Sequence, residues 1–166
     1  MDANVKTNRT LQVERTIKAL KKNNIDARFL ETTEDVVPAV TSLLTKGESV
    51  AVGGSVTLKE TGLLDLLRNG DYTFYDRYKP GLDKKGISEV MHKSFFVDTY
   101  LASANAVTEH GELYCVDGTS NRVAALLYGP KQVILVVSWD KIVPDLVSAI
   151  LRVKQLAAPS NARRLN

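Results

Sequence analysis

Apolar residues recur along the chain at two different spacings. Val13, Ile17 and Leu20 follow one another at intervals of four and three residues with lysines between them, which predicts an amphipathic helix over 8–23. The run 131–138, "KQVILVVS", is instead almost continuously apolar, which is typical of a strand that is covered on both faces of its sheet.

The same two spacings, with the turn residues between them, predict the remaining elements. Further helical segments are expected at 32–47, 58–68, 87–95, 121–129 and 143–158, the last ending before Pro159. Further strands are expected within 23–31, 49–54, 72–76, 99–108 and 111–117. The last two flank the short turn Glu109-His110-Gly111 and predict a β-hairpin. Strands that alternate with helices in this way predict an α/β fold, a three-layer sandwich with a mostly parallel sheet and one β-hairpin.

The composition fits one globular domain and restricts its chemistry. The 166 residues are 44% hydrophobic and 25% charged, and no repeat or Pro/Gly-rich linker divides them. We expect a single domain over 1–166, with an N-terminal helix in 1–24, a core in 25–158 and a C-terminal extension in 159–166. Cys115 is the only cysteine, and the two histidines have no partner at metal-ligand spacing, so neither a disulfide nor a metal site is predicted.

Nothing in the pattern points to a membrane or to nucleic acid. The sequence has no signal-like apolar region and no apolar stretch of about 18 residues, so we expect neither secretion nor membrane spanning, but a cytoplasmic location. The net charge is +3, yet the basic excess lies at the two ends of the chain, whereas 25–145 is net acidic. Without a basic stripe interleaved with aromatic residues, nucleic-acid binding is not predicted.

The segment 50–67, "VAVGGSVTLKETGLLDLL", leads from a predicted strand into a predicted helix and has two interpretations. Ligands of parallel α/β sheets bind beyond the carboxyl ends of strands, so the Gly53-Gly54 turn could bring backbone N–H groups to an anion, with hydroxyl donors from Ser55 and Thr57. Alternatively, Thr57 and Glu60 form a capping box and the turn only connects the two elements. The spacing matches neither G-x-x-x-x-G-K-[ST] nor G-x-G-x-x-G, so no nucleotide motif is predicted.

A second strand-turn-helix junction follows the predicted hairpin. Asp117-Gly118 ends a strand, and Ser120 or Asn121 can cap the next helix. Arg122 lies in the first helical turn, where a guanidinium could pair with an anion but is badly matched to the helix dipole and requires a compensating partner. If both junctions open on the same edge of the sheet, they face each other across a cleft.

Glu109, in the hairpin turn, is the candidate catalytic group. A carboxylate at this position could act as a nucleophile or base, although a solvated loop glutamate is the simpler interpretation.

The segments 50–78, 94–137 and 140–166 together resemble the LUD-domain family, in particular its lactate-utilisation protein C group. The resemblance is to a short form without the cysteine-bearing C-terminal tail of many members, whether that form is natural or truncated. It implies a Rossmann-like core similar to the sugar-phosphate isomerase and CoA-transferase superfamily. It also implies a place in bacterial oxidation of L-lactate to pyruvate, beside iron–sulfur partner subunits.

The resemblance also implies which residues line the superfamily's cleft. One wall would consist of Gly53, Gly54, Ser55, Thr57, Glu60, Thr61 and Gly62, and the other of Asn105, Glu109, Gly111, Asn121 and Arg122. The turn Thr108-Glu109-His110-Gly111 is similar to the Ser-Glu-Asn-Gly turn of related CoA-transferases, whose glutamate forms the acyl intermediate, but has His110 in place of the asparagine.

From these observations we expect a protein of lactate or related organic-acid metabolism that binds a small anionic metabolite or a phosphate-bearing cofactor such as CoA at the two glycine-containing junctions. Two alternatives stay open. One is an acyl-CoA transferase or hydrolase that uses Glu109, and the other is a non-catalytic adaptor that assembles with iron–sulfur redox subunits. A homodimer is compatible with the superfamily, although the sequence shows no patch that predicts it, and no membrane or nucleic-acid partner is expected.

Overall fold

The computed structural model of the protein describes residues 2–165. Backbone contacts divide this chain into two compact units. The sheet unit consists of Leu30–Ser103 and Asp117–Val136, and the hairpin unit consists of Ala104–Val116 with the described residues before Leu30 and after Val136.

The sheet unit contains a four-stranded, entirely parallel sheet. Its strands are β1 (Ser49–Val52), β2 (Thr73–Tyr75), β3 (Thr99–Ala102) and β6 (Gln132–Leu135), in the spatial order β2-β1-β3-β6. After β1 the chain adds β2 on one side and then returns to add β3 on the other, so the order reverses between β1 and β3. The crevice outside the carboxyl ends of two such strands is where open α/β sheets bind ligands.

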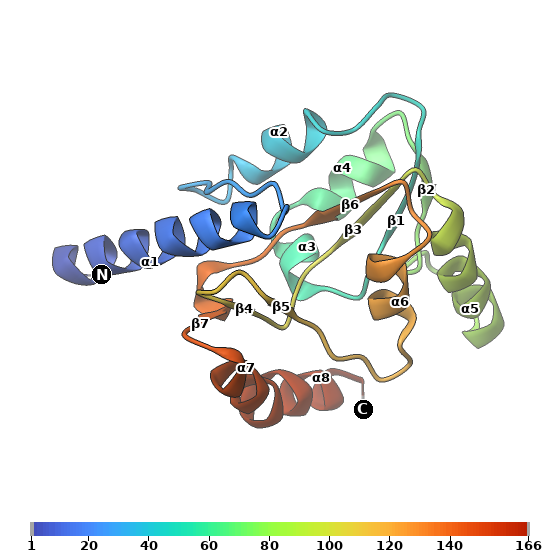
Figure 1. The fold of residues 1–166 in the computed structure, drawn as a ribbon. Coiled ribbons are helices and arrows are strands. Elements are labelled where there is room, and N and C mark those ends of the chain that lie inside the picture. The colour runs from blue at the N-terminus through green and yellow to red at the C-terminus, as the bar shows by residue number, and fades with distance from the viewer. Residues whose placement is uncertain (1, 166) are drawn as a thin grey trace. The chain divides into compact units, whose positions relative to one another are not determined.

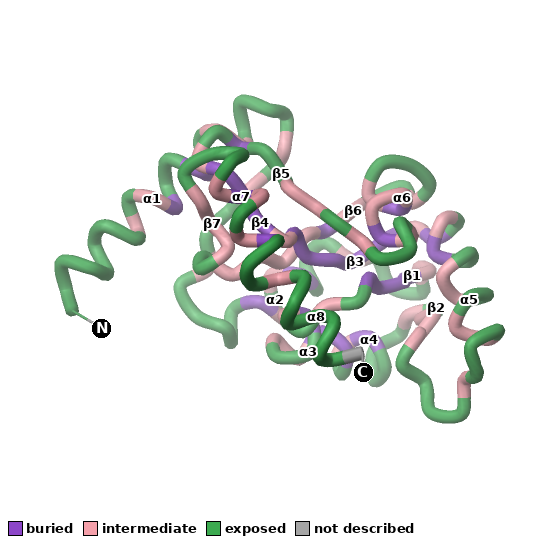
Figure 2. Tube along the Cα trace, turned by 90° about the horizontal axis from the view of Figure 1, so that it is seen from below, coloured by how far each residue is buried: buried purple, intermediate pink, exposed green. Residues whose placement is uncertain are grey.

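Side chains alternate between the two faces of this sheet and form an apolar core on each. Val50, Val52 and Leu101 pack on one face with residues of α2 (Val36–Thr41), α3 (Val56–Glu60) and α4 (Leu63–Asn69). Ala51, Tyr100 and Ala102 pack on the other face with residues of the 3-10 turn Ser94–Phe96 and of α6 (Asn121–Leu127). The helix α5 (Lys84–Lys93) precedes that turn. Figure 1 shows α2 and α4 on one side of the sheet, and Figure 2 shows that β1 and β3 are its most buried strands.

The hairpin unit contains a small mixed sheet and the terminal helices. The strands β4 (Ala106–Thr108) and β5 (Leu113–Tyr114) are antiparallel, which confirms the predicted hairpin, and β7 (Ile142–Val143) runs parallel to β4. The helices are α1 (Ala3–Lys22), α7 (Leu146–Arg152) and α8 (Ala158–Leu165), with the 3-10 turn Trp139–Lys141 before β7. None of the described helices is both long and apolar enough to cross a bilayer.

Three predicted segments are divided or shortened. The helix predicted at 32–47 is confined to α2, and the one predicted at 58–68 is split because Gly62 adopts a left-handed conformation with φ 74°. The segment 99–108 forms β3 and β4, which belong to different sheets. No strand forms within 23–31, where alternating half-buried side chains lie on extended backbone without a sheet partner.

The structure refines one prediction about the last third of the chain and contradicts another. The apolar run 131–138 forms β6, and its side chains contribute to the apolar cores on both faces, as predicted, although β6 is an edge strand in which only Ile134 is buried. The C-terminal helix does not break before Pro159. A π-helical turn at Val153–Ala157 widens the backbone just before the proline, whose missing N–H and ring then cause no conflict in the first turn of α8.

Candidate functional site

The double glycine lies at the carboxyl end of β1, next to β3. The Gly53 N–H donates to the Leu101 carbonyl at 2.8 Å. A Cβ atom at Gly53 would lie 3.0 Å from the Tyr100 hydroxyl and 3.3 Å from both Ala102 Cβ and Arg122 Cδ. A side chain at this position would therefore be tightly packed, whereas a Cβ atom at the exposed Gly54 would meet only Arg77 and Tyr78 at ordinary contact distances.

The residue that caps α3 is Ser55, and the predicted capping box is wrong. Ser55 has extended backbone, and its hydroxyl oxygen accepts the Leu58 N–H at 3.3 Å. Thr57 and Glu60 lie inside this short helix, and the Thr61 hydroxyl donates to the Thr57 carbonyl at 2.9 Å. With the cap two residues earlier than predicted, only Ser55 lies between the glycine turn and the first residue of the helix, Val56.

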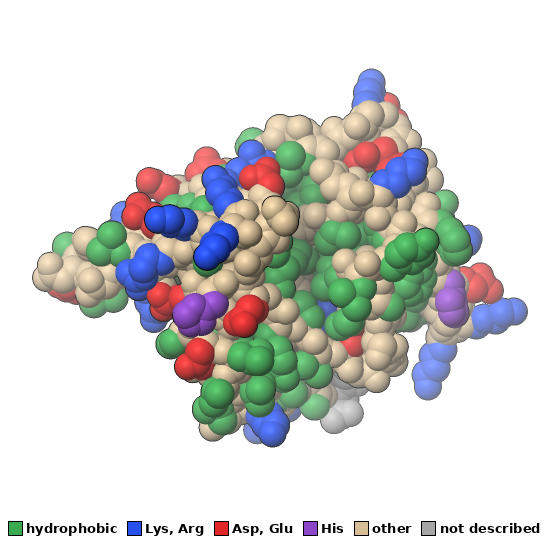
Figure 3. All heavy atoms as spheres, in the orientation of Figure 1, with side chains coloured by type: hydrophobic (Ala, Val, Ile, Leu, Met, Phe, Trp, Pro, Cys, Tyr) green, Lys and Arg blue, Asp and Glu red, His purple; other side chains and the backbone are tan. Residues whose placement is uncertain are grey.

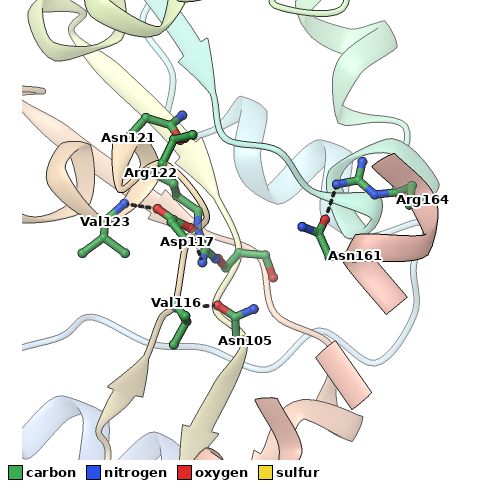
Figure 4. Close-up of polar contacts among 10 residues, drawn as sticks. Asn105, Val116, Asp117, Asn121, Arg122, Val123, Asn161 and Arg164 are labelled. Atoms are coloured by element: carbon green, nitrogen blue, oxygen red, sulfur yellow. Dashed lines mark hydrogen bonds and ion pairs between the residues drawn. The ribbon is translucent and has the colours of Figure 1, made fainter. Parts of the chain in front are cut away.

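Arg122 is buried and held by Asp117 (Figure 4). Its guanidinium donates to Asp117 Oδ1 from Nε at 2.8 Å and from Nη2 at 2.7 Å, and Nη1 donates to the Ser103 carbonyl. Both side chains are only about a tenth exposed, at 10% and 11%. Asp117 is thus the compensating partner that an arginine in a first helical turn requires. The pair fastens the start of α6 to the end of β3.

Asp117 also caps α6, in place of the predicted Ser120 or Asn121. Its second oxygen accepts the Val123 N–H at 2.7 Å. Ser120 occupies the cap position with φ 59° but its side chain makes no capping hydrogen bond. The Asn121 amide oxygen accepts the Thr119 hydroxyl at 2.7 Å and points away from the Arg122–Asp117 pair (Figure 4).

Three further residues lie at this edge that the sequence pattern did not single out as site residues: Arg77, Tyr78 and Tyr100. Arg77 and Tyr78 follow β2, the other neighbour of β1, and the Tyr78 hydroxyl accepts the Ser55 N–H at 3.3 Å. The Arg77 guanidinium lies 5.7 Å from the centre of the Tyr78 ring and 3.7 Å from the Cβ position of Gly54. The sequence contains a signal for Arg77 and Tyr78, because "YDRY" (75–78) lies at the carboxyl end of a predicted strand, as the two glycines do.

Tyr100 lies on β3 with only 1% of its surface exposed. Burial raises the pKa of its phenol to about 12, while the positive charges of Arg77 and Arg122 act in the opposite direction. The phenol is therefore a neutral hydrogen-bond donor at every ordinary pH.

Glu109, in the hairpin unit, is held by α1. Its Oε1 accepts from the Gln12 amide at 2.8 Å, and its Oε2 accepts from Arg15 Nε at 3.2 Å and Nη2 at 3.0 Å. The hydrogen bond from Gln12, followed by the contacts with Arg15, lowers the pKa of Glu109 against the opposing effect of burial. A carboxylate with both oxygens engaged in this way favours an anchoring role for Glu109 over that of a nucleophile.

The other two predicted residues of the hairpin unit also have structural contacts. The Asn105 side-chain oxygen accepts the Val116 N–H at 2.9 Å (Figure 4), and the Asn105 carbonyl accepts from Arg152 at 2.6 Å. Gly111 has φ 82°, and a Cβ there would lie 2.6–2.8 Å from backbone atoms of Ala19 and Leu20.

The predicted site residues thus divide between the units. Asn105, Glu109 and Gly111 belong to the hairpin unit, and the remaining ones, from Gly53 to Thr61 with Asn121 and Arg122, belong to the sheet unit. Among the residues that the structure describes, no three His, Cys, Asp or Glu side chains are grouped so as to hold a metal ion.

Comparison with known proteins gives one match. The sequence model of the LUD domain matches residues 13–166, nearly the whole chain, which confirms the resemblance seen in the sequence. No curated protein and no solved structure matches the chain.

Proposed function

Because the chain belongs to the LUD-domain family, we propose that it serves lactate or related organic-acid utilisation by binding a small anionic metabolite or a phosphate-bearing cofactor. The binding site of this proposal is the carboxyl edge of the parallel sheet, between β1, β2 and β3. It comprises Gly53, Gly54, Arg77, Tyr78 and Tyr100, and we call it the strand-end site.

Arg77 is the observation that carries this proposal. Every other arginine at this edge is neutralised: Arg122 by Asp117, and Arg68 by Asp76 at 2.8 Å. Arg77 forms no ion pair with a carboxylate of the described chain and lies against the exposed face of Gly54. An unneutralised guanidinium beside a turn without side chains favours an oxyanion, to which arginine can donate two parallel hydrogen bonds.

This proposal changes the role first assigned to Arg122. Its charge is already compensated, and its hydrogen bonds run to Asp117 and to the Ser103 carbonyl. In the proposed site Arg122 keeps the ends of β3 and α6 together, and Arg77 supplies the charge for the ligand.

The sheet unit also supports the finer fold that the resemblance implied. Its strand order and the helix-bearing apolar cores on both faces are compatible with a three-layer, Rossmann-like arrangement. We propose on this basis that it is related in fold to the sugar-phosphate isomerase and CoA-transferase superfamily.

Native mass spectrometry tests the proposed function. The purified protein is incubated with lactate, pyruvate, CoA, acetyl-CoA, NAD, ATP and a folate, and retained ligands are compared between wild type, Arg77→Gln and Lys46→Gln. Lys46→Gln is the control, because it removes the same charge at the opposite edge of the sheet, where Lys46 precedes β1 and pairs with Asp71. We expect one ligand class to be retained by wild type and Lys46→Gln and lost from Arg77→Gln. If nothing in the panel binds, or Arg77→Gln binds as wild type does, the proposed function is wrong.

A second candidate, an adaptor that assembles with iron–sulfur subunits or with a second copy of the chain, is favoured by one observation. Phe96, Leu127 and Tyr128 are 87%, 80% and 88% exposed. Gly129 packs against the backbone of Phe95, so the two chain segments that carry these side chains meet, and hydrophobic side chains gather on this side of the molecule near α6 (Figure 3). Large exposed apolar side chains in a cluster are typical of protein-binding surfaces.

Sedimentation tests the adaptor candidate. Wild type and Leu127→Glu/Tyr128→Glu are compared alone and with purified iron–sulfur subunits of lactate oxidation. Association of wild type that the double variant loses would support the adaptor. A monomer that binds no subunit would contradict it.

A further inference from the structure

We propose that Tyr100 is the residue through which the strand-end site selects its ligand: Arg77 holds two oxygens of an oxyanion, and the Tyr100 hydroxyl donates a hydrogen bond to a further oxygen of the same ligand. This inference rests on the proposed function, since it names the chemistry of the same site.

The Tyr100 hydroxyl is a donor without an acceptor. No hydrogen bond among the described residues involves this hydroxyl, although only 1% of the residue is exposed. Glu48 Oε1 is the only fully enclosed side-chain oxygen without a partner in the described chain, so the equally unpartnered Tyr100 hydroxyl must still reach solvent. The ring is buried, and its hydroxyl is neither hydrogen-bonded within the described chain nor completely enclosed.

That atom is directed at the glycine turn. It lies 3.0 Å from the position that a Cβ atom of Gly53 would take, while Arg77 Nη1 lies 3.7 Å from the corresponding position of Gly54. Because neither glycine has a side chain, no side chain of the turn separates the phenol from the guanidinium. A ligand that lies along the turn meets both donors.

The two donors differ in what they recognise. Arg77 attracts any anion, whereas a neutral phenol adds affinity only for a ligand with an acceptor oxygen at the correct position. Burial keeps Tyr100 protonated, with a pKa of about 12, so its O–H stays available to donate. The ligand class of this proposal is an oxyanion with an acceptor oxygen beyond the two held by Arg77, either a phosphate group or a carboxylate with a neighbouring hydroxyl.

Three small probes separate the contributions: acetate, glycolate and inorganic phosphate. Acetate and glycolate differ only in one hydroxyl, so the ratio of their dissociation constants reports the contact with Tyr100. Calorimetric titrations are made with wild type, Tyr100→Phe, Arg77→Gln and Tyr72→Phe. The last removes a phenol hydroxyl from the residue before β2, at the other end of the strand.

We expect wild type and Tyr72→Phe to prefer glycolate or phosphate over acetate by about fivefold to tenfold, the range of one neutral hydrogen bond. Tyr100→Phe should abolish the preference and leave acetate binding unchanged, and Arg77→Gln should weaken all probes. A preference for glycolate supports a carboxylate with a neighbouring hydroxyl as the ligand, and a preference for phosphate supports a phosphate group.

The inference is overturned if Tyr100→Phe keeps the wild-type preference, or if wild type has none while Arg77→Gln still weakens acetate. In both cases the proposed function survives without a role for Tyr100. Equal binding to wild type and Arg77→Gln contradicts the proposed function itself. Tyr100→Phe retains the buried ring, and an unchanged unfolding transition confirms that its fold is intact.

Discussion

Replacement of Gly111 by alanine separates a structural role from a ligand-binding one. Gly111 was predicted to line the cleft, yet its backbone has φ 82° and its α-carbon faces α1. An added methyl group would lie 2.6 Å from the Ala19 carbonyl carbon and 2.8 Å from both the Ala19 oxygen and the Leu20 nitrogen. These are backbone atoms in the middle of a helical turn, so they cannot move aside as the end of a flexible side chain could.

Two costs follow for the free energy of unfolding. A left-handed backbone costs an alanine about 1–2 kcal/mol, partly offset by about 0.4–1 kcal/mol from the restricted unfolded chain. Overpacking against a rigid neighbour adds about 1–3 kcal/mol. Gly47 supplies the matched control, because it has φ 81° but no atom within 4 Å of its Cβ position. We expect Gly47→Ala to cost about 1 kcal/mol or less, and Gly111→Ala about 2–4 kcal/mol.

Urea unfolding measures both costs. Trp139 is the only tryptophan and belongs to the hairpin unit, so its fluorescence reports the unit that contains Gly111, while circular dichroism follows the whole chain. Equal destabilisation by the two substitutions would refute the argument from packing. A Gly111→Ala protein of normal stability that lost ligand binding would instead restore Gly111 to the site.

Three further predictions concern buried and partnered charges. Arg122→Met should lower the free energy of unfolding by about 3–5 kcal/mol in denaturant titrations, because it leaves Asp117 buried without its partner; a loss below about 1 kcal/mol would show that the pair is not a clamp. Glu109→Gln should cost less than about 1 kcal/mol at neutral pH. The folded-state pKa of Glu109 is lowered, so its contribution to stability is present above the ordinary pKa of about 4.3 and is lost as pH falls through the folded value. Acid unfolding of the variant should therefore depend less steeply on pH than that of wild type. An identical profile would contradict the contacts with Gln12 and Arg15. The pKa of Tyr100 is raised to about 12, so its contribution to stability is fully present below about pH 10 and is lost as pH rises from there through 12. Tyr100→Phe should therefore lose less stability at alkaline pH than wild type does. The same alkaline loss in both proteins would count against a buried phenol.

The local pattern determined much of the architecture. Spacing of apolar residues located α1, α5 and α6, and turn residues located β1, β2 and the hairpin, because these features depend on residues close together in the chain. The family was also recognisable from the sequence, and the match over 13–166 confirms it. Even the need for a partner of Arg122 followed from its place in a helical turn, although the identity of that partner did not.

Competition between similar local signals was decided only by packing. Ser55 and Thr57 are both good caps, and the backbone at the end of β1 selected Ser55. The run 131–138 is apolar enough for a central strand, but the pairing order gave the centre to β1 and β3 and the edge to β6. Hydrophobicity predicts that a segment will be buried but does not predict which elements will pack against it.

The strand-end site depended entirely on tertiary structure. Gly53, Arg77 and Tyr100 are separated by more than twenty residues at each step, and only parallel pairing of β1 with β2 and with β3 brings their strand ends to one edge. In the sequence alone Tyr100 is one apolar residue of a strand and Arg77 one charge of a loop. In the structure the Tyr100 hydroxyl lies beside a turn without side chains, and Arg77, on the other side of that turn, pairs with no carboxylate of the described residues.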